Sequence, residues 1–310
     1  MSYVGKAETD YMAAYVKKGA QAVRPLISGN RQNLFSSAVL KNTAYITMFI
    51  DHFFAVVFLP VMRQYQRAGY PVDGMQLAYT AGRAVGRIAF ILFAYQMVEG
   101  FLHTRSRKNY LLRLGLFALV SEIPFDLAFS ETYFDPTGQN VFFTLFLGML
   151  ALTIWEWASD KAASVRAAAG SRLSRGILLG LRIGALLSCC EAAWLLKTDY
   201  KYMGVLLIFA FYQTHDSELS VRMLAAGCVM LFGTWSANYL KYAGKFSAGY
   251  LFEFSLREMY GLFAFLWIGL YNGKKGRQLP KAFYYGFYPV HLLLLHIAAD
   301  MILSGMVNVL

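Results

Sequence analysis

Apolar stretches of about 20 residues dominate this chain, and each is long enough to cross a bilayer. Backbone amides and carbonyls find no water inside the hydrocarbon core, so these stretches must be helical. We predict an all-α, polytopic integral membrane protein with about nine spans, the sixth short or tilted. The predicted spans are residues 40–60, 84–103, 110–128, 140–158, 177–196, 201–214, 221–239, 255–272 and 283–303.

Composition supports this prediction. Of 310 residues, 57% are hydrophobic and 15% charged, against about 25% charged in soluble proteins. The net charge of +11 indicates basic cytoplasmic loops and contact with membrane lipid, and no nucleic acid partner is expected. The three cysteines lie in apolar segments, without the spacing of a disulfide framework or a metal site.

Residues 1–38 are predicted to form an amphipathic arm that lies along the inner membrane surface. Aromatic residues such as Tyr3 and Tyr11 alternate there with basic residues such as Lys6 and Lys17. The arm has no apolar core of a signal peptide. Residues 39–310 are expected to form a single transmembrane domain without an internal repeat.

Basic residues predict the orientation. With nine spans, 20 of the 29 Lys and Arg residues fall on one side, whereas residues 131–139 on the other side contain none. Cytoplasmic loops carry the excess of Lys and Arg. The N-terminus is therefore predicted inside and the C-terminus outside.

Asp51 and His52 lie in the middle of the first span, where a charge costs about 2.5–3.5 kcal/mol on insertion scales. An imidazole can act as a general base or as a nucleophile near neutral pH. We expect His52 to carry chemistry, with Asp51 orienting it or binding another helix. The alternative is a structural His–Asp pair that locks helix packing.

The second span carries ionisable residues at both ends. Arg87 lies one turn below Arg83 and is expected to be paired inside the protein. Glu99 and His103 share a face near the inner surface. No second histidine-rich helix completes a metal site, so none is expected.

The turn after the second span is densely basic, with Arg105, Arg107 and Lys108. It is either a cytoplasmic membrane anchor or a cradle for the phosphates of an anionic cofactor, which arginine binds bidentately.

Polar groups also collect toward the predicted outer side. Glu122 and Asp126 share one face of the third span, and Asn140 begins the fourth. His291 lies near the middle of the last span and is a second candidate for the core site. An excess of acid here would suit a cationic acceptor.

Seven segments carry a family resemblance: MFIDH from Met48, GRIAF from Gly86, VEGFLHTRSRKNYLLRL from Val98, SEIPFDLAF from Ser121, NVFFTLFLG from Asn140, DYKYMGVLLI from Asp199 and FYPVHLLLL from Phe287. Together they resemble the TraX family of conjugative pilin acetylation proteins.

The resemblance implies an acetyltransferase of the bacterial cytoplasmic membrane, related to the acyltransferase-3 and heparan-type enzymes. It implies acetyl-CoA as the cytoplasmic co-substrate, a catalytic histidine at His52, and a protein or peptide amine as the outer acceptor. The resemblance implies that the cofactor is bound by Glu99, His103, Arg105, Arg107, Lys108 and His291. It implies that the residues acting with His52 in catalysis are Asp51, Arg87, Glu122, Asp126 and Asn140. Arg87 or Asn140 would stabilise the oxyanion.

Three other functions stay open at this stage. A surface glycan could be the acceptor, through an amine or a hydroxyl. Ionisable groups at the midplane also serve as proton relays in transporters and flippases, although no inverted repeat is visible. A non-catalytic assembly protein of a surface or pilus machine is the third.

Overall fold

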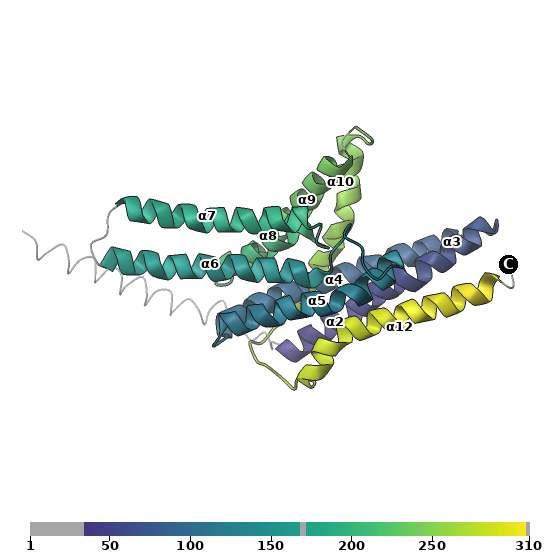
Figure 1. The fold of residues 1–310 in the computed structure, drawn as a ribbon, viewed down its shortest axis with the longest axis horizontal. Coiled ribbons are helices and arrows are strands. Elements are labelled where there is room, and N and C mark those ends of the chain that lie inside the picture. The colour runs from purple at the N-terminus through teal and green to yellow at the C-terminus, as the bar shows by residue number, and fades with distance from the viewer. Residues whose placement is uncertain (1–33, 168–171, 243, 308–310) are drawn as a thin grey trace, which may run out of the picture.

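The structure, a computed structural model, describes residues 34–167, 172–242 and 244–307 (Figure 1). These residues form helices and loops with two isolated bridges and no sheet, which confirms the all-α prediction. Residues 1–33, which make up most of the predicted amphipathic arm, lie outside the described residues.

The helices follow one another with short connections. They are α2 (Ser37–His52), the π-helix η1 (Phe53–Phe58), α3 (Leu59–Arg67), α4 (Asp73–His103), α5 (Arg107–Ser130), α6 (Val141–Ala167), α7 (Arg172–Leu195), α8 (Lys201–Gln213), α9 (Leu219–Tyr242), α10 (Ala248–Leu256), the 3₁₀ helix η2 (Arg257–Ala264), α11 (Phe265–Gly269) and α12 (Lys281–Val307).

Within the described residues, six helical segments are long and apolar enough to span a membrane. They are Ser37–Arg67, Asp73–His103, Val141–Lys161, Gly176–Leu195, Leu219–Tyr242 and Ala282–Met306. The polytopic prediction is confirmed, but the expected nine spans exceed these six.

The other three expected spans are helical and differ for separate reasons. Helix α5 carries charged residues along its length, including Arg113, Glu122 and Asp126. Helix α8 has only 13 residues, about 20 Å of helix. The segment expected at 255–272 is broken by the 3₁₀ helix η2 between α10 and α11.

Helix α4 forms the centre of the fold. It contacts α2, α8 and η2, and 61% of its most apolar stretch is buried, against 11% for α7 and 22% for α9. Buried residues such as Phe90, Ile91 and Leu92 point in successive directions around α4, as expected for a helix enclosed by others. The described residues therefore leave most of the surface of α7 and α9 uncovered.

Backbone contacts join loops that were predicted to share a side of the membrane. The amides of Ser37 and Ala38, at the start of α2, donate to the carbonyls of Lys274 (2.8 Å) and Lys275 (3.1 Å). First-turn amides have no partner within their own helix, so this loop caps α2. On the other side, the Gln139 amide donates to the Lys197 carbonyl at 3.2 Å.

Candidate functional site

Two histidines from opposite ends of the sequence meet inside the helical bundle. The Nδ1 atom of His52, on α2, lies 2.7 Å from Nε2 of His291, on α12. Their rings are nearly parallel (8°), with centroids 5.0 Å apart, so they meet edge to edge in nearly one plane. Their exposed fractions are only 9% and 4%.

A second hydrogen bond fixes where the protons sit in this histidine pair. Nδ1 of His291 lies 2.7 Å from the carbonyl oxygen of Phe287, which can only accept. His291 Nδ1 must therefore carry the proton, and in the neutral ring Nε2 is then an acceptor. His52 consequently donates from Nδ1, and its own Nε2 keeps a free lone pair.

The helix widens immediately after His52. Residues Phe53–Phe58 form a π-helix, in which the amide of Leu59 bonds to the carbonyl of Phe54, five residues back. Pro60 explains the location, because it lacks an amide proton and its ring crowds the carbonyl of Val56. Single π turns within α-helices are frequent at functional sites.

Asp51 turns away from the histidine pair toward α4. Its Oδ2 accepts a hydrogen bond from Nη1 of Arg83 at 2.7 Å. Gly86 makes this approach possible, because a Cβ at that position would collide with the Asp51 carboxylate. The structure therefore pairs Asp51 with Arg83, and the contact that orients His52 comes from His291.

A charged cluster surrounds Arg87 on the same part of α4. Its Nε lies 3.4 Å from Oε1 of Glu258, on η2. Asp199, in the loop after α7, is exposed at the surface but still lies near Arg83 and Arg87. Partial desolvation by the surrounding protein, offset in part by Arg87, raises its pKa to about 6. The ring of Tyr200 stacks on Phe90, with centroids 3.5 Å apart.

Glu258 and Asp199 were not among the predicted site residues. Each is an acidic residue within or beside an apolar segment, and that signal alone marks a functional candidate. Many acidic residues of this chain lie in or beside apolar segments, so the sequence signal does not single out Glu258 and Asp199. Their proximity to Arg87 in the structure does.

A second polar group lies on α5. Asn140 donates from Nδ2 to Oε2 of Glu122 (2.5 Å) and to the carbonyl of Ala118 (2.7 Å). Asp126 accepts from the amide of Asp135 at 2.9 Å. Among the described residues, Oε1 of Glu122 and Oδ1 of Asp126 are buried without a hydrogen-bond partner.

This group faces the histidine pair. Glu122, Asp126 and Phe129 follow one another at four- and three-residue steps, so they share a face of α5. The ring of Phe129 meets that of His52 edge to face, with centroids 5.6 Å apart. The structure thus brings His52, His291 and this face of α5 together, and it places Asp51, on α2, beside Arg83 and near Arg87, both on α4.

The predicted cofactor residues lie elsewhere, at the junction of α4 and α5. Arg107 contacts Glu156 at 3.4 Å, and His103 bonds to the carbonyl of Glu99 at 2.8 Å. Arg105 and Lys108 are exposed.

These residues are far from the histidine pair. Asp51 touches Gly86, and Glu99 is 13 residues further along α4, which is about 20 Å of helix. Of the expected cofactor residues, His291 is the one that the structure places beside His52. Within the described residues, no three His, Cys, Asp or Glu side chains are grouped so that they could hold a metal ion.

Fold and site define a polytopic helical membrane protein with an enclosed histidine pair and buried charged groups. The chain belongs to the TraX family, whose profile, described as TraX protein, matches residues 36–299. It is also 28% identical over 270 residues to the probable fimbrial assembly protein FimC, serogroup H1, of Dichelobacter nodosus, covering 84% of this chain and 94% of that protein. No solved structure matches the chain.

Proposed function

We propose that this protein is a membrane acetyltransferase that moves an acetyl group from cytoplasmic acetyl-CoA to an amine at the outer face, on a pilin or another surface protein. The observation that carries the proposal is the His52–His291 pair, which leaves His52 Nε2 as a buried base. The TraX family and the relative named for fimbrial assembly support a pilin-associated role.

His52 would act as general base. An amine attacks a thioester carbonyl only when neutral, so a group must take its proton. His52 Nε2 accepts that proton as the nitrogen–carbon bond forms. It then returns a proton to the CoA sulfur as the carbon–sulfur bond breaks. The donation from His52 Nδ1 to His291 stabilises the imidazolium that exists between the two transfers.

Arg87 is the better candidate for stabilising the negative charge that develops on the carbonyl oxygen. Both amide protons of Asn140 are already donated, to Glu122 and to Ala118. The contact of Arg87 to Glu258 engages only Nε, so other guanidinium protons can serve the oxyanion.

The co-substrate would enter at the junction of α4 and α5. Arg105 and Lys108 are exposed there and suit the phosphates of acetyl-CoA. The gap of about 20 Å to His52 calls for an elongated molecule whose reactive end lies far from its phosphates. We propose the bacterial cytoplasmic membrane as the location, with the N-terminus inside, so that this junction faces the cytoplasm.

The test uses the purified full chain in liposomes with isotope-labelled acetyl-CoA and a peptide that carries a free N-terminal amine. We expect His52→Gln to lower the transfer rate by about 10²–10⁴-fold, the usual contribution of a general base. His296→Gln is the control, because His296 lies on α12 and pairs with Asp300 instead (3.5 Å). Unchanged transfer by His52→Gln would refute the role of His52. Proton-coupled transport without acetyl transfer would refute the enzyme.

A further inference from the structure

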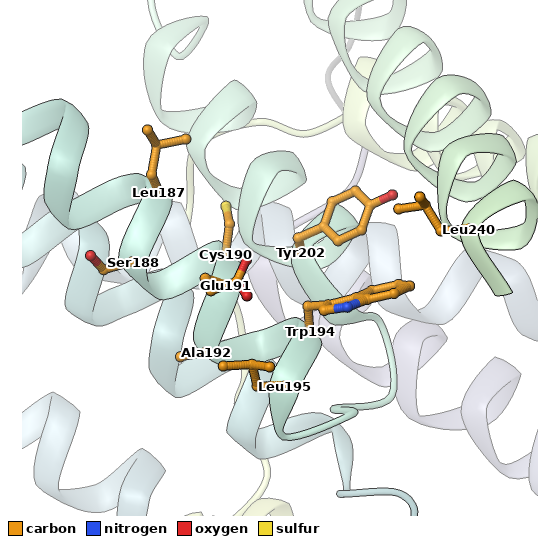
Figure 2. Close-up of a pocket in the computed structure, with 9 residues that line it drawn as sticks. All are labelled: Leu187, Ser188, Cys190, Glu191, Ala192, Trp194, Leu195, Tyr202 and Leu240. Carbon is orange, nitrogen blue, oxygen red and sulfur yellow. The ribbon is translucent and has the colours of Figure 1, made fainter.

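A pocket of about 680 Å³ opens between α7, α8 and α9, none of which carries a histidine of the pair (Figure 2). Helix α7 supplies most of its wall, Tyr202 comes from α8 and Leu240 from α9. Helices α7 and α9 both pack on α8, which is short. Because α7 and α9 are mostly unburied, we expect this pocket to face the lipid.

One acidic side chain lies in this apolar wall. Glu191 is exposed, and within the described residues it has no hydrogen bond or salt bridge. It lies one turn before α7 ends at Leu195, which places it near the headgroup level of the bilayer and not at its centre. At that level the carboxylate can reach the cationic part of a lipid headgroup.

Aromatic rings lie beside Glu191. The rings of Trp194 and Tyr202 are 5.6 Å apart between centroids, and the Tyr202 hydroxyl is held by Ser236 Oγ at 2.7 Å. In Figure 2 the carboxylate of Glu191 lies on the side of α7 that faces both rings. Aromatic faces attract cations, so rings and carboxylate favour the same charge.

Two lysines adjoin residues that line the pocket, since Lys201 precedes Tyr202 and Lys241 follows Leu240. The ammonium group of Lys201 lies 5.4 Å from the ring centroid of Trp194, and that of Lys241 lies 5.1 Å from the ring centroid of Tyr242. The two lysines repel each other, the Asp199 carboxylate attracts Lys201 in part, and neither lysine forms a salt bridge within the described residues. An anion between them would relieve that repulsion.

We propose that this pocket binds one phospholipid whose headgroup carries both a phosphate and a primary ammonium group. The phosphate lies between Lys201 and Lys241, and the ammonium group donates to Glu191. The acyl chains follow Leu187 and Leu240.

The size of the pocket argues against a protein helix as occupant. A helix about 10–12 Å across fills about 420–610 Å³ per turn of 5.4 Å. The pocket would therefore hold little more than one turn, whereas a headgroup and the first part of its chains fit.

Native mass spectrometry of the full chain in detergent tests this assignment. The probes are phosphatidylethanolamine, which has the ammonium group, and phosphatidylglycerol, which lacks it. We expect the native protein to retain phosphatidylethanolamine roughly ten-fold more tightly, as one hydrogen bond to a charged group allows. Glu191→Gln should lose that preference, and Glu253→Gln, an exposed acid on α10, should keep it.

A second variant guards against misfolding as the cause. Leu240→Trp should fill the pocket and reduce retention of both lipids, while the melting temperature stays close to native. Equal retention of the two lipids by the native protein, or an unchanged preference in Glu191→Gln, would overturn the proposal. Acetyl transfer is not measured, so the outcome is independent of the proposed enzymatic function.

Discussion

Replacing His291 by leucine tests the assignment of protons in the histidine pair. His52 Nδ1 donates to His291 over 2.7 Å in a buried setting, and leucine removes the acceptor. A buried donor left without a partner costs about 1–3 kcal/mol. His52 then has no reason to keep its proton on Nδ1, and the tautomer with the base at Nε2 loses that preference.

The expected result follows from this free energy. Since 1.36 kcal/mol corresponds to ten-fold in rate, kcat should fall by about 5- to 150-fold. KM for the acceptor should change little, because His291 contacts His52 and not the substrate in this account. The pH profile should move as well, because the imidazolium of His52 loses the partner that stabilises it.

His291→Gln is the matched rescue. The glutamine side chain reaches about as far as a histidine Nε2 and can present an oxygen to His52 Nδ1, so much of the activity should return. The assay is acetyl transfer at saturating acetyl-CoA, with melting temperature and size-exclusion profile as checks on folding. Full activity of His291→Leu with the native pH profile would refute the reasoning.

Three further predictions concern the charged groups around α4. Gly86→Ala should destabilise the fold by about 1–3 kcal/mol and so lower the melting temperature, because its Cβ enters the space of the Asp51 carboxylate. An unchanged melting curve would show that Asp51 moves freely. A double-mutant cycle of Asp51→Asn and Arg83→Gln, read by thermal unfolding, should give a coupling of about 1–3 kcal/mol, since the pair is partly screened from water; additive effects would contradict it. For Asp199, the folded pKa of about 6 exceeds the ordinary value of 3.8, so the folded state gains stability as pH falls from 6 to 4. Asp199→Asn should therefore stabilise the fold at pH 7.5 by about 1 kcal/mol or less, since Asp199 is exposed, and so raise the melting temperature. The gain should vanish near pH 4. A lower melting temperature at pH 7.5 would show that the charge of Asp199 stabilises the fold.

Much of the fold could be predicted from the sequence because the membrane limits the choices. Apolar runs such as Leu40–Pro60 must be helical, and the helices α2, α4, α6, α7, α9 and α12 coincide with predicted spans. The sequence predicted three more spans than meet the requirements of length and composition. The short α8, the charged α5 and the segment broken by η2 were expected as spans and do not meet the requirements of length and composition.

The candidate site shows a similar division. The sequence identified His52 and His291 separately, as ionisable groups deep in apolar segments. It did not show that they meet, since the two positions are 239 residues apart. It left open whether Asp51 orients His52 or binds another helix, and the structure directs Asp51 to Arg83 on α4.

The sequence by itself determined that this chain is helical, that it lies in a membrane and which ionisable groups lie deep in it. Only the tertiary structure decided which of those groups touch. The physical reason is that lipid-facing and inward-facing surfaces of a membrane helix are both apolar, so the sequence pattern does not report how each helix is rotated. Close packing at positions such as Gly86 sets that rotation, and with it the pairs Asp51–Arg83 and His52–His291.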